Sequence, residues 1–174
     1  MNTHTPADPS EALRRSKRPK AAIAGPYGHP FHPVAVTIPI GAWSASLIFD
    51  LISFFVDGPE PFVVGARILL VIGIAGAVLA SVLGFMDFLT LRRHTAAHRT
   101  ALMHMAFNSA ALALFIVSAV LRFDGPATEV DVLAFVISLV AFAAVGASGW
   151  LGGKLAYHFG VRVADESTQI EGFR

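Results

Sequence analysis

The stretch HPFHPVAVTIPIGAWSASLIFDLISFFV, residues 29–56, decides the fold. From residue 34 onward it is an apolar run whose only formal charge is Asp50. A helix rises 1.5 Å per residue, so a run of this length is sufficient to cross the ~30 Å hydrocarbon core of a bilayer. The stretch therefore predicts a transmembrane helix over about residues 34–56.

Two histidines stand at the start of this helix, and each precedes a proline: His29-Pro30 and His32-Pro33. Proline has a fixed φ and no backbone donor, and it drives the preceding residue toward extended geometry. The sequence therefore predicts that both imidazoles lie on a stiff, non-helical segment at a membrane surface.

Three further apolar runs follow, in a chain that is 55% hydrophobic and 14% charged. Soluble domains have about 25% charged residues, so this composition is typical of a membrane protein. We predict an all-α fold, an integral membrane bundle of four transmembrane helices. The helices are expected at about 34–56, 63–91, 101–121 and 132–153. Two helical hairpins in tandem would describe this order, although the sequence shows no convincing repeat.

The predicted bundle occupies residues 29–163, and polar segments flank it. Residues 1–28 hold five Lys and Arg among Pro, Ser, Ala and Gly, which predicts a disordered basic N-terminal tail. Residues 164–174 are expected to form a polar C-terminal tail. Of the 13 Lys and Arg, all but Arg67 and Arg122 lie on the side of the two tails and the 92–99 loop. The positive-inside rule then predicts that both termini are cytoplasmic.

This topology gathers histidines on one side of the membrane. The residues on that side are His29, His32, His94, His98, His104 and His158. His104 lies inside a span, with Asn108 one helical turn deeper on the same face. Polar side chains inside a membrane are costly, and they are usually paired or functional.

Two interpretations of His104 remain open from the residues alone. In the first, it bonds to Asp87 or to the 29–33 segment and ties helices together. In the second, it binds haem b or a transition-metal ion, because neutral imidazole is a common ligand and four-helix bundles build such sites. The metal ligands would then be His32 and His104, with His29 as an alternate. Asp87 and Asn108 would orient the ligating side chains.

Asp50 lies in the outer half of the first helix, where an unpaired carboxylate would be costly. We expect a structural ion pair with Arg67 at the start of the second helix, or else a proton-carrying carboxylate. The chain has no cysteine, which excludes disulfides, thiolate-bound iron–sulfur clusters and covalent c-type haem. The sequence contains no Ser-His-Asp spacing, no HExxH motif and no glycine-rich phosphate loop, so nothing in it supports hydrolase chemistry, and the question of an enzyme stays open.

A series of motifs in this order resembles the bacterial membrane family named domain of unknown function 2231, over about residues 28–163. The motifs are HPFHP at 29–33, IPIG at 38–41, GFMD at 84–87, LMHMAFN at 102–108 and GWLGGKLAY at 149–157. The resemblance implies a four-helix protein of the bacterial inner (plasma) membrane with no established activity. Some similar proteins carry a C-terminal Rieske-type iron–sulfur domain, and this resemblance implies an electron-transfer setting. This sequence has no cysteine for such a cluster, and it has Thr37 where some relatives have another histidine.

Our lead hypothesis is a haem- or metal-binding electron-transfer module with a histidine-rich cytoplasmic end. It would require a membrane redox partner. The alternatives are a cofactor-free structural or partner-binding subunit, including a homo-oligomer, and a small proton-coupled transporter that uses Asp50 and Asp87. Membrane lipid is the expected surrounding, and the net charge of +1 gives no reason to expect nucleic acid.

Overall fold

The computed structural model describes residues 8–174, so the first seven residues of the predicted tail lie outside the described residues. Within 8–174 the chain forms helices and turns and contains no strand. Four segments are long and apolar enough to cross a membrane: His32–Ser53, Glu60–Phe88, Ala96–Asp124 and Val132–His158. The predicted all-α fold of four transmembrane helices is therefore confirmed.

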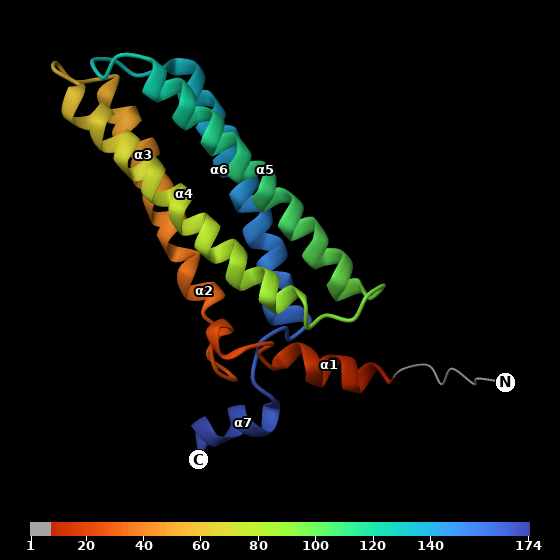
Figure 1. The fold of residues 1–174 in the computed structure, drawn as a ribbon. Coiled ribbons are helices and arrows are strands. Elements are labelled where there is room, and N and C mark those ends of the chain that lie inside the picture. Colours follow the sequence, from red (N-terminus) through yellow and green to blue (C-terminus); the bar gives the residue numbers. More distant parts are fainter. Residues whose placement is uncertain (1–7) are drawn as a thin grey trace.

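The first span consists of a short helix, α2 (His32–Ala35), and a longer one, α3 (Thr37–Ser53). The other spans are α4 (Glu60–Phe88), α5 (Ala96–Asp124) and α6 (Val132–Gly153), which continues through a π-helical segment, η2 (Lys154–His158). Figure 1 shows that both described ends of the chain lie at one end of the bundle, beside the α4–α5 loop. We call this the terminal end, and we call the end with the other two loops the opposite end.

Helix α6 has the predicted limits, whereas the other three spans begin and end a few residues away from theirs. The first begins at His32, so this histidine is not on an extended segment as predicted. Pro33 occupies the first turn, where its missing N–H is not needed. The break between α2 and α3 falls at Val36, three residues before Pro39, which has no N–H to donate to the carbonyl of Ala35.

The four spans form two tightly packed pairs, α3 with α4 and α5 with α6. Large rings join the pairs at mid-bundle: the Trp43 indole stacks on Phe115 with ring centres 3.9 Å apart. Gly73 of α4 leaves room for the indole, since a Cβ there would overlap the Trp43 ring. The indole N–H donates to the carbonyl of Leu70, 3.4 Å away, so this buried polar atom is satisfied.

From residue 8 the N-terminal segment contains helical structure, in a region where the sequence predicts a disordered tail. Helix α1 (Pro9–Lys17) begins at an Asp8 cap, and the turn η1 (Ala22–Ala24) leads to the first span. The segment gains its order from contacts distant in sequence. The backbone N–H of Arg162 donates to Ser16 O, and Lys17 pairs with Asp165 at 3.5 Å.

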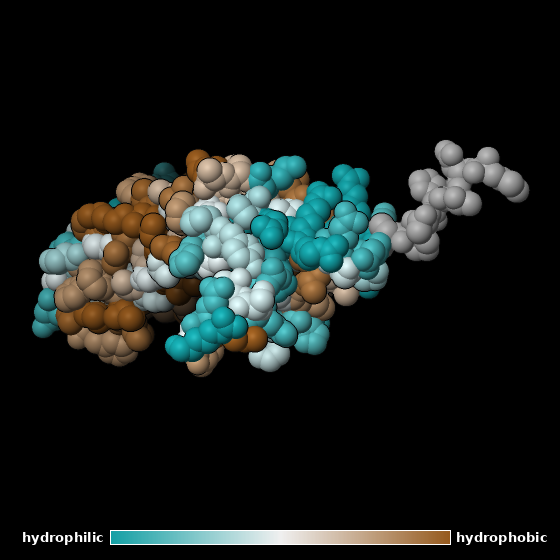
Figure 2. Space-filling view, turned by 90° about the horizontal axis from the view of Figure 1, so that it is seen from below, coloured by the Kyte–Doolittle hydropathy of each residue, from teal (hydrophilic) through white to brown (hydrophobic). Residues whose placement is uncertain are grey.

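The polar C-terminal residues are helical as well. They form α7 (Glu166–Ile170) and the short turn η3 (Glu171–Phe173). Seen from below in Figure 2, hydrophilic residues dominate the terminal end, while hydrophobic residues extend along the flank. Together the two termini build a polar cap on an apolar bundle.

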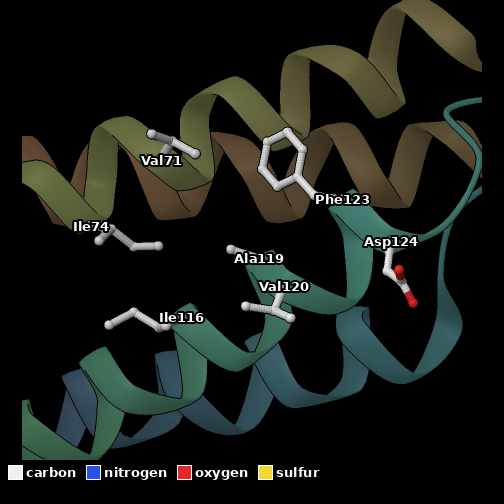
Figure 3. Close-up of a pocket in the computed structure, with 7 residues that line it drawn as sticks. All are labelled: Val71, Ile74, Ile116, Ala119, Val120, Phe123 and Asp124. Atoms are coloured by element: carbon white, nitrogen blue, oxygen red, sulfur yellow. The ribbon is translucent and has the colours of Figure 1, made fainter.

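A shallow apolar groove of about 740 Å³ lies between α4 and α5, in the half of the bundle toward the opposite end (Figure 3). Its lining residues are Val71, Ile74, Ile116, Ala119, Val120, Phe123 and Asp124. Figure 3 shows apolar side chains from both helices facing this groove. It is part of the bundle wall and contains none of the predicted site residues.

Candidate functional site

His32 belongs to α2, and its imidazole reaches across to α4. Its Nδ1 lies 2.9 Å from the carbonyl oxygen of Ala80. The ring lies against Gly84, where an added Cβ would be 2.9 Å from His32 Cε1. A glycine one turn beyond the accepting carbonyl thus lets the ring approach the helix backbone closely.

His104 of α5 makes the same kind of contact with α6. Its Nδ1 lies 2.9 Å from the carbonyl oxygen of Ser148, and the Ser148 hydroxyl is equally close. The ring lies against Gly152, where a Cβ would be 3.2 Å from His104 Cε1. The Asn108 amide donates to His104 Nε2 at 3.1 Å.

These contacts determine which nitrogen carries the proton in each neutral imidazole. A carbonyl oxygen can only accept, so Nδ1 of His32 and of His104 must donate. The Nε2 atom of each ring then keeps its lone pair. The two rings face one another edge to face, with centres 6.3 Å apart and planes at 90°. The structure therefore brings together His32 and His104, the two predicted metal ligands.

The other predicted site residues have different positions. Asn108 does contact His104, but at Nε2, the atom that would hold a metal. The side chain of His29 is exposed on the segment before α2. The predicted bond from His104 to Asp87 or to the 29–33 segment is replaced by the bonds to Ser148 and Asn108.

Asp87 instead pairs with Arg162, whose Nε lies 2.8 Å from Oδ1, although the two are not aligned as a hydrogen bond. Arg162 is only 4% exposed and also donates to the carbonyls of Ala24 and Gly25. It thus joins α4 to both terminal segments. Sequence reasoning missed Arg162 because it lies in the polar region after the last span, where an arginine is ordinarily solvated.

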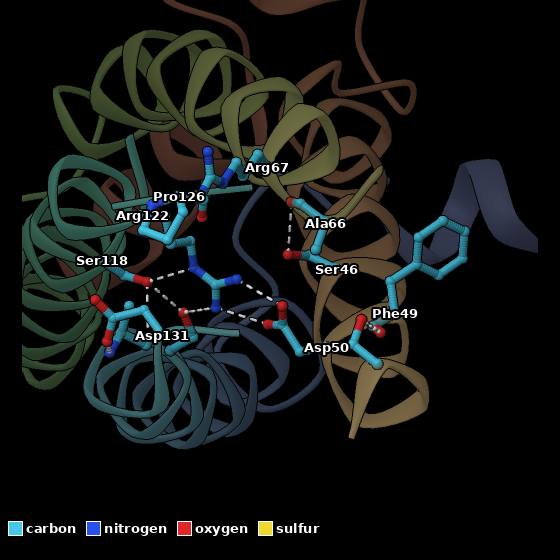
Figure 4. Close-up of polar contacts among 12 residues, drawn as sticks. Ser46, Phe49, Asp50, Ala66, Arg67, Ser118, Arg122, Pro126 and Asp131 are labelled. Atoms are coloured by element: carbon cyan, nitrogen blue, oxygen red, sulfur yellow. Dashed lines mark hydrogen bonds and ion pairs between the residues drawn. The ribbon is translucent and has the colours of Figure 1, made fainter. Parts of the chain in front are cut away.

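A second buried polar cluster lies at the opposite end, around Asp50 and Arg122 (Figure 4). The guanidinium donates to both carboxylate oxygens at 2.6 Å, a bidentate pair that is almost fully buried. Its Nε donates to the hydroxyl of Ser118 at 3.1 Å, and this hydroxyl also meets Ser138. Such complete pairing is what allows two charges to lie inside an apolar bundle.

The predicted Asp50–Arg67 pair is therefore wrong, because Asp50 binds Arg122. The helix that was expected to end at residue 121 runs to Asp124, which brings Arg122 inside the bundle. Arg67 donates instead to the backbone carbonyls of Gly125 and Pro126 in the α5–α6 loop.

Among residues 8–174, no three His, Cys, Asp or Glu side chains converge on one point. His94 has φ +64° and precedes α5, so it does not share a helix face with His98. The protein thus offers a pair of imidazoles rather than a complete cage of metal ligands. Two ligands are too few for a tetrahedral zinc site, but haem iron already has four nitrogens from its porphyrin.

Comparisons with known proteins agree with the fold and leave the activity open. Neither the curated proteins nor the solved structures gave a match. A family described as "Predicted membrane protein (DUF2231)" matches residues 28–165, which include the four spans, both facing histidines and Arg162. The chain therefore belongs to the DUF2231 family of membrane proteins of unknown function.

Proposed function

We propose that this membrane protein binds one metal centre, haem b iron or a single transition-metal ion, between His32 and His104. The observation that supports the proposal is the pair of Nδ1 bonds to the carbonyls of Ala80 and Ser148. Histidines that bind metals commonly donate the second ring nitrogen to a carbonyl, which orients the ring and frees Nε2. Here two rings on different helices have this arrangement and face one another.

The separation of the rings also supports the proposal. Nε2 of His32 and Nε2 of His104 would hold one metal centre between the two rings. The observed centre-to-centre distance is 6.3 Å. The ligand count favours haem over a bare ion, because a porphyrin supplies the equatorial nitrogens.

A haem bound here would supply one-electron chemistry, and the chain's own residues would tune its surroundings. The two carbonyls would hold the ring orientations, and Gly84 and Gly152 would let the rings lie close to α4 and α6. Asn108 would have to release His104 Nε2 before that nitrogen could bind a metal. An electron-transfer role would further require a redox partner in the membrane.

The orientation belongs to the same proposal. We place the terminal end, with the histidine pair near it, on the cytoplasmic side of a bacterial inner membrane. The excess of Lys and Arg in the segments at that end supports this orientation.

The direct test is titration of the purified protein with haemin and, separately, with Zn²⁺ and Cu²⁺. Substitution of either His32 or His104 by alanine is expected to weaken binding by more than ~100-fold, the upper end of the loss when a group that only supports a ligand is removed. His98→Ala is the matched control, since its ring packs on Phe88 instead of the pair. Selective loss for haemin assigns haem, and selective loss for an ion assigns that ion.

A second candidate is a cofactor-free protein in which these histidines only join helices. The bond from Asn108 to His104 Nε2 favours this candidate, because it already uses the lone pair. In that case no titrant binds with a dependence on either histidine, and His104→Ala lowers the unfolding temperature. Binding that is equal in wild type and both alanine variants would overturn the metal-centre proposal.

A further inference from the structure

Residues on α2, α3 and α5 correspond at one constant spacing. His32, Trp43, Ser46 and Asp50 each have a counterpart 72 positions later: His104, Phe115, Ser118 and Arg122. Except for the histidines, which are partly exposed, both members of every pair are buried. Three of these four positions are therefore buried in both segments, and the histidines and serines are identical.

Helices α4 and α6 correspond in the same way, with a spacing of 68. The corresponding pairs are Ala66 and Ala134, Leu70 and Ser138, Gly73 and Ala141, Ala80 and Ser148, and Gly84 and Gly152. The first four pairs are buried in both helices. The change in spacing means that the two hairpins differ by four residues in the turn between their helices.

The contacts inside each hairpin repeat as well. Nδ1 of His32 bonds to Ala80 O, and Nδ1 of His104 bonds to the corresponding Ser148 O, both at 2.9 Å. In each case Cε1 of the ring is the atom that a Cβ added at the corresponding glycine would meet first.

The serines on the same helices give a third repeated contact. Ser46 Oγ donates to Ala66 O at 2.9 Å, and Ser118 Oγ donates to Ala134 O at 2.8 Å. Three kinds of contact thus recur at corresponding positions, which a chance similarity of apolar helices does not explain.

Between the hairpins, corresponding residues meet one another. His32 faces His104, Trp43 stacks on Phe115, and Asp50 pairs with Arg122. Equivalent residues of two copies touch each other only where a two-fold axis passes between them. Helices α3 and α5 both run from the terminal end to the opposite end, so this axis runs along the bundle (Figure 1).

We infer that residues 32–88 and 104–156 are two copies of one helical hairpin, related by an internal two-fold axis. We further infer that Asp50 and Arg122 make the contact between the copies specific. Two hairpins with the same charge at this position would bring like charges together in an apolar interior. Opposite charges favour pairing of each hairpin with the other one and disfavour pairing with its own kind.

The symmetry leads to a sharp expectation about exchanging the two charges. If the positions are equivalent, an arginine at 50 finds Ser46 one turn earlier, as Arg122 finds Ser118. The carboxylate of the aspartate at 122 then accepts hydrogen bonds from both terminal guanidinium nitrogens of the arginine at 50. The one mismatch is Leu70, which stands where Arg122 has Ser138, so a Leu70→Ser change completes the exchange.

The experiment uses full-length protein in detergent and measures the yield of folded monomer and the unfolding temperature. The single variants Asp50→Arg and Arg122→Asp are expected to lose most of the folded monomer. The single variants are expected to unfold at a lower temperature than the wild type. The exchange D50R/R122D, with or without Leu70→Ser, is expected to recover at least half of this decrease. The control is the exchange D87R/R162D, which lies off the axis and is expected not to recover.

If D50R/R122D recovers stability and D87R/R162D does not, the internal symmetry is supported. This result does not depend on what the protein binds. If D50R/R122D fails both with and without Leu70→Ser, the two positions are not equivalent and the inference is wrong. Equal recovery of the D87R/R162D exchange would also overturn it, because charge complementarity would then suffice without an axis.

Discussion

The side chains of Asp50 and Arg122 form a bidentate, almost fully buried ion pair between α3 and α5. Breaking a buried ion pair by removing one partner costs about 3–5 kcal/mol, because the remaining charge is left unpaired. Asp50→Asn is therefore expected to lower the free energy of unfolding by about this amount, measured by denaturant titration in detergent. Arg67→Gln is the control, since Arg67 bonds only loop carbonyls and should cost less. A larger loss for Arg67→Gln would contradict the assignment.

The two glycines beneath the imidazoles allow a second prediction at the scale of residues. In Gly84→Ala the new Cβ would be 2.9 Å from His32 Cε1, so the ring must move away from Ala80 O. Overpacking of this kind costs about 1–3 kcal/mol. Gly146→Ala is the control, because nothing lies within 4 Å of that position and alanine favours helices. The unfolding temperatures of the two variants are measured by thermal unfolding. If Gly84→Ala unfolds at the same temperature as Gly146→Ala, the His32 ring does not pack closely on Gly84.

Residue types predicted part of the site from sequence alone. The polar side chains of His104 and Asp50 lie inside apolar spans, so the sequence predicted that each has a partner, and both do. The partners could not be chosen, because Arg67 and Arg122 both lie near helix ends and the choice depends on where α5 stops. Arg162 gave no signal, since its burial arises only when α1, η1 and the end of the chain fold over α4.

At the scale of elements, the docking of the N-terminal segment on the C-terminal one should depend on pH. The Tyr27 hydroxyl, which donates to the carboxylate, and then Lys17 hold the pKa of Asp165 below its ordinary value of 3.8. A depressed pKa in the folded state means that this contribution is full above the ordinary value and is lost as the pH falls through the lowered pKa.

Hydrogen–deuterium exchange of residues 9–28, corrected for the intrinsic pH dependence, tests this docking. Protection is expected to fall in strongly acidic buffer, as Asp165 becomes protonated. In Asp165→Asn the acid step should disappear, while the four spans remain protected. An unchanged acid step in that variant would show that another group controls the docking.

At the scale of the whole molecule, the orientation can be tested because the chain has no cysteine of its own. Ser167 and Thr128 are exposed at the terminal and opposite ends. In intact cells, a membrane-impermeant maleimide is expected to label Thr128→Cys and to leave Ser167→Cys unlabelled until the membrane is opened. The reverse pattern would contradict cytoplasmic termini.

The sequence predicted the four spans because hydrophobic length is a strong signal that needs no knowledge of packing. It did not reveal the duplication, because two of the three pairs that meet on the axis are complementary rather than identical. Trp43 stacks on Phe115, and Asp50 binds Arg122. A search for identical residues at a constant spacing misses these two pairs.

The most direct test of the central claim is a visible absorption spectrum of the protein purified in mild detergent from haem-replete cells. It should be recorded oxidised and then reduced with dithionite, with metal analysis of the same sample. A metal centre between His32 and His104 predicts either a Soret band with sharp reduced α and β bands, or one equivalent of a transition metal that is absent from His104→Ala. A colourless, metal-free wild type would contradict the account and leave the two histidines as helix-joining residues.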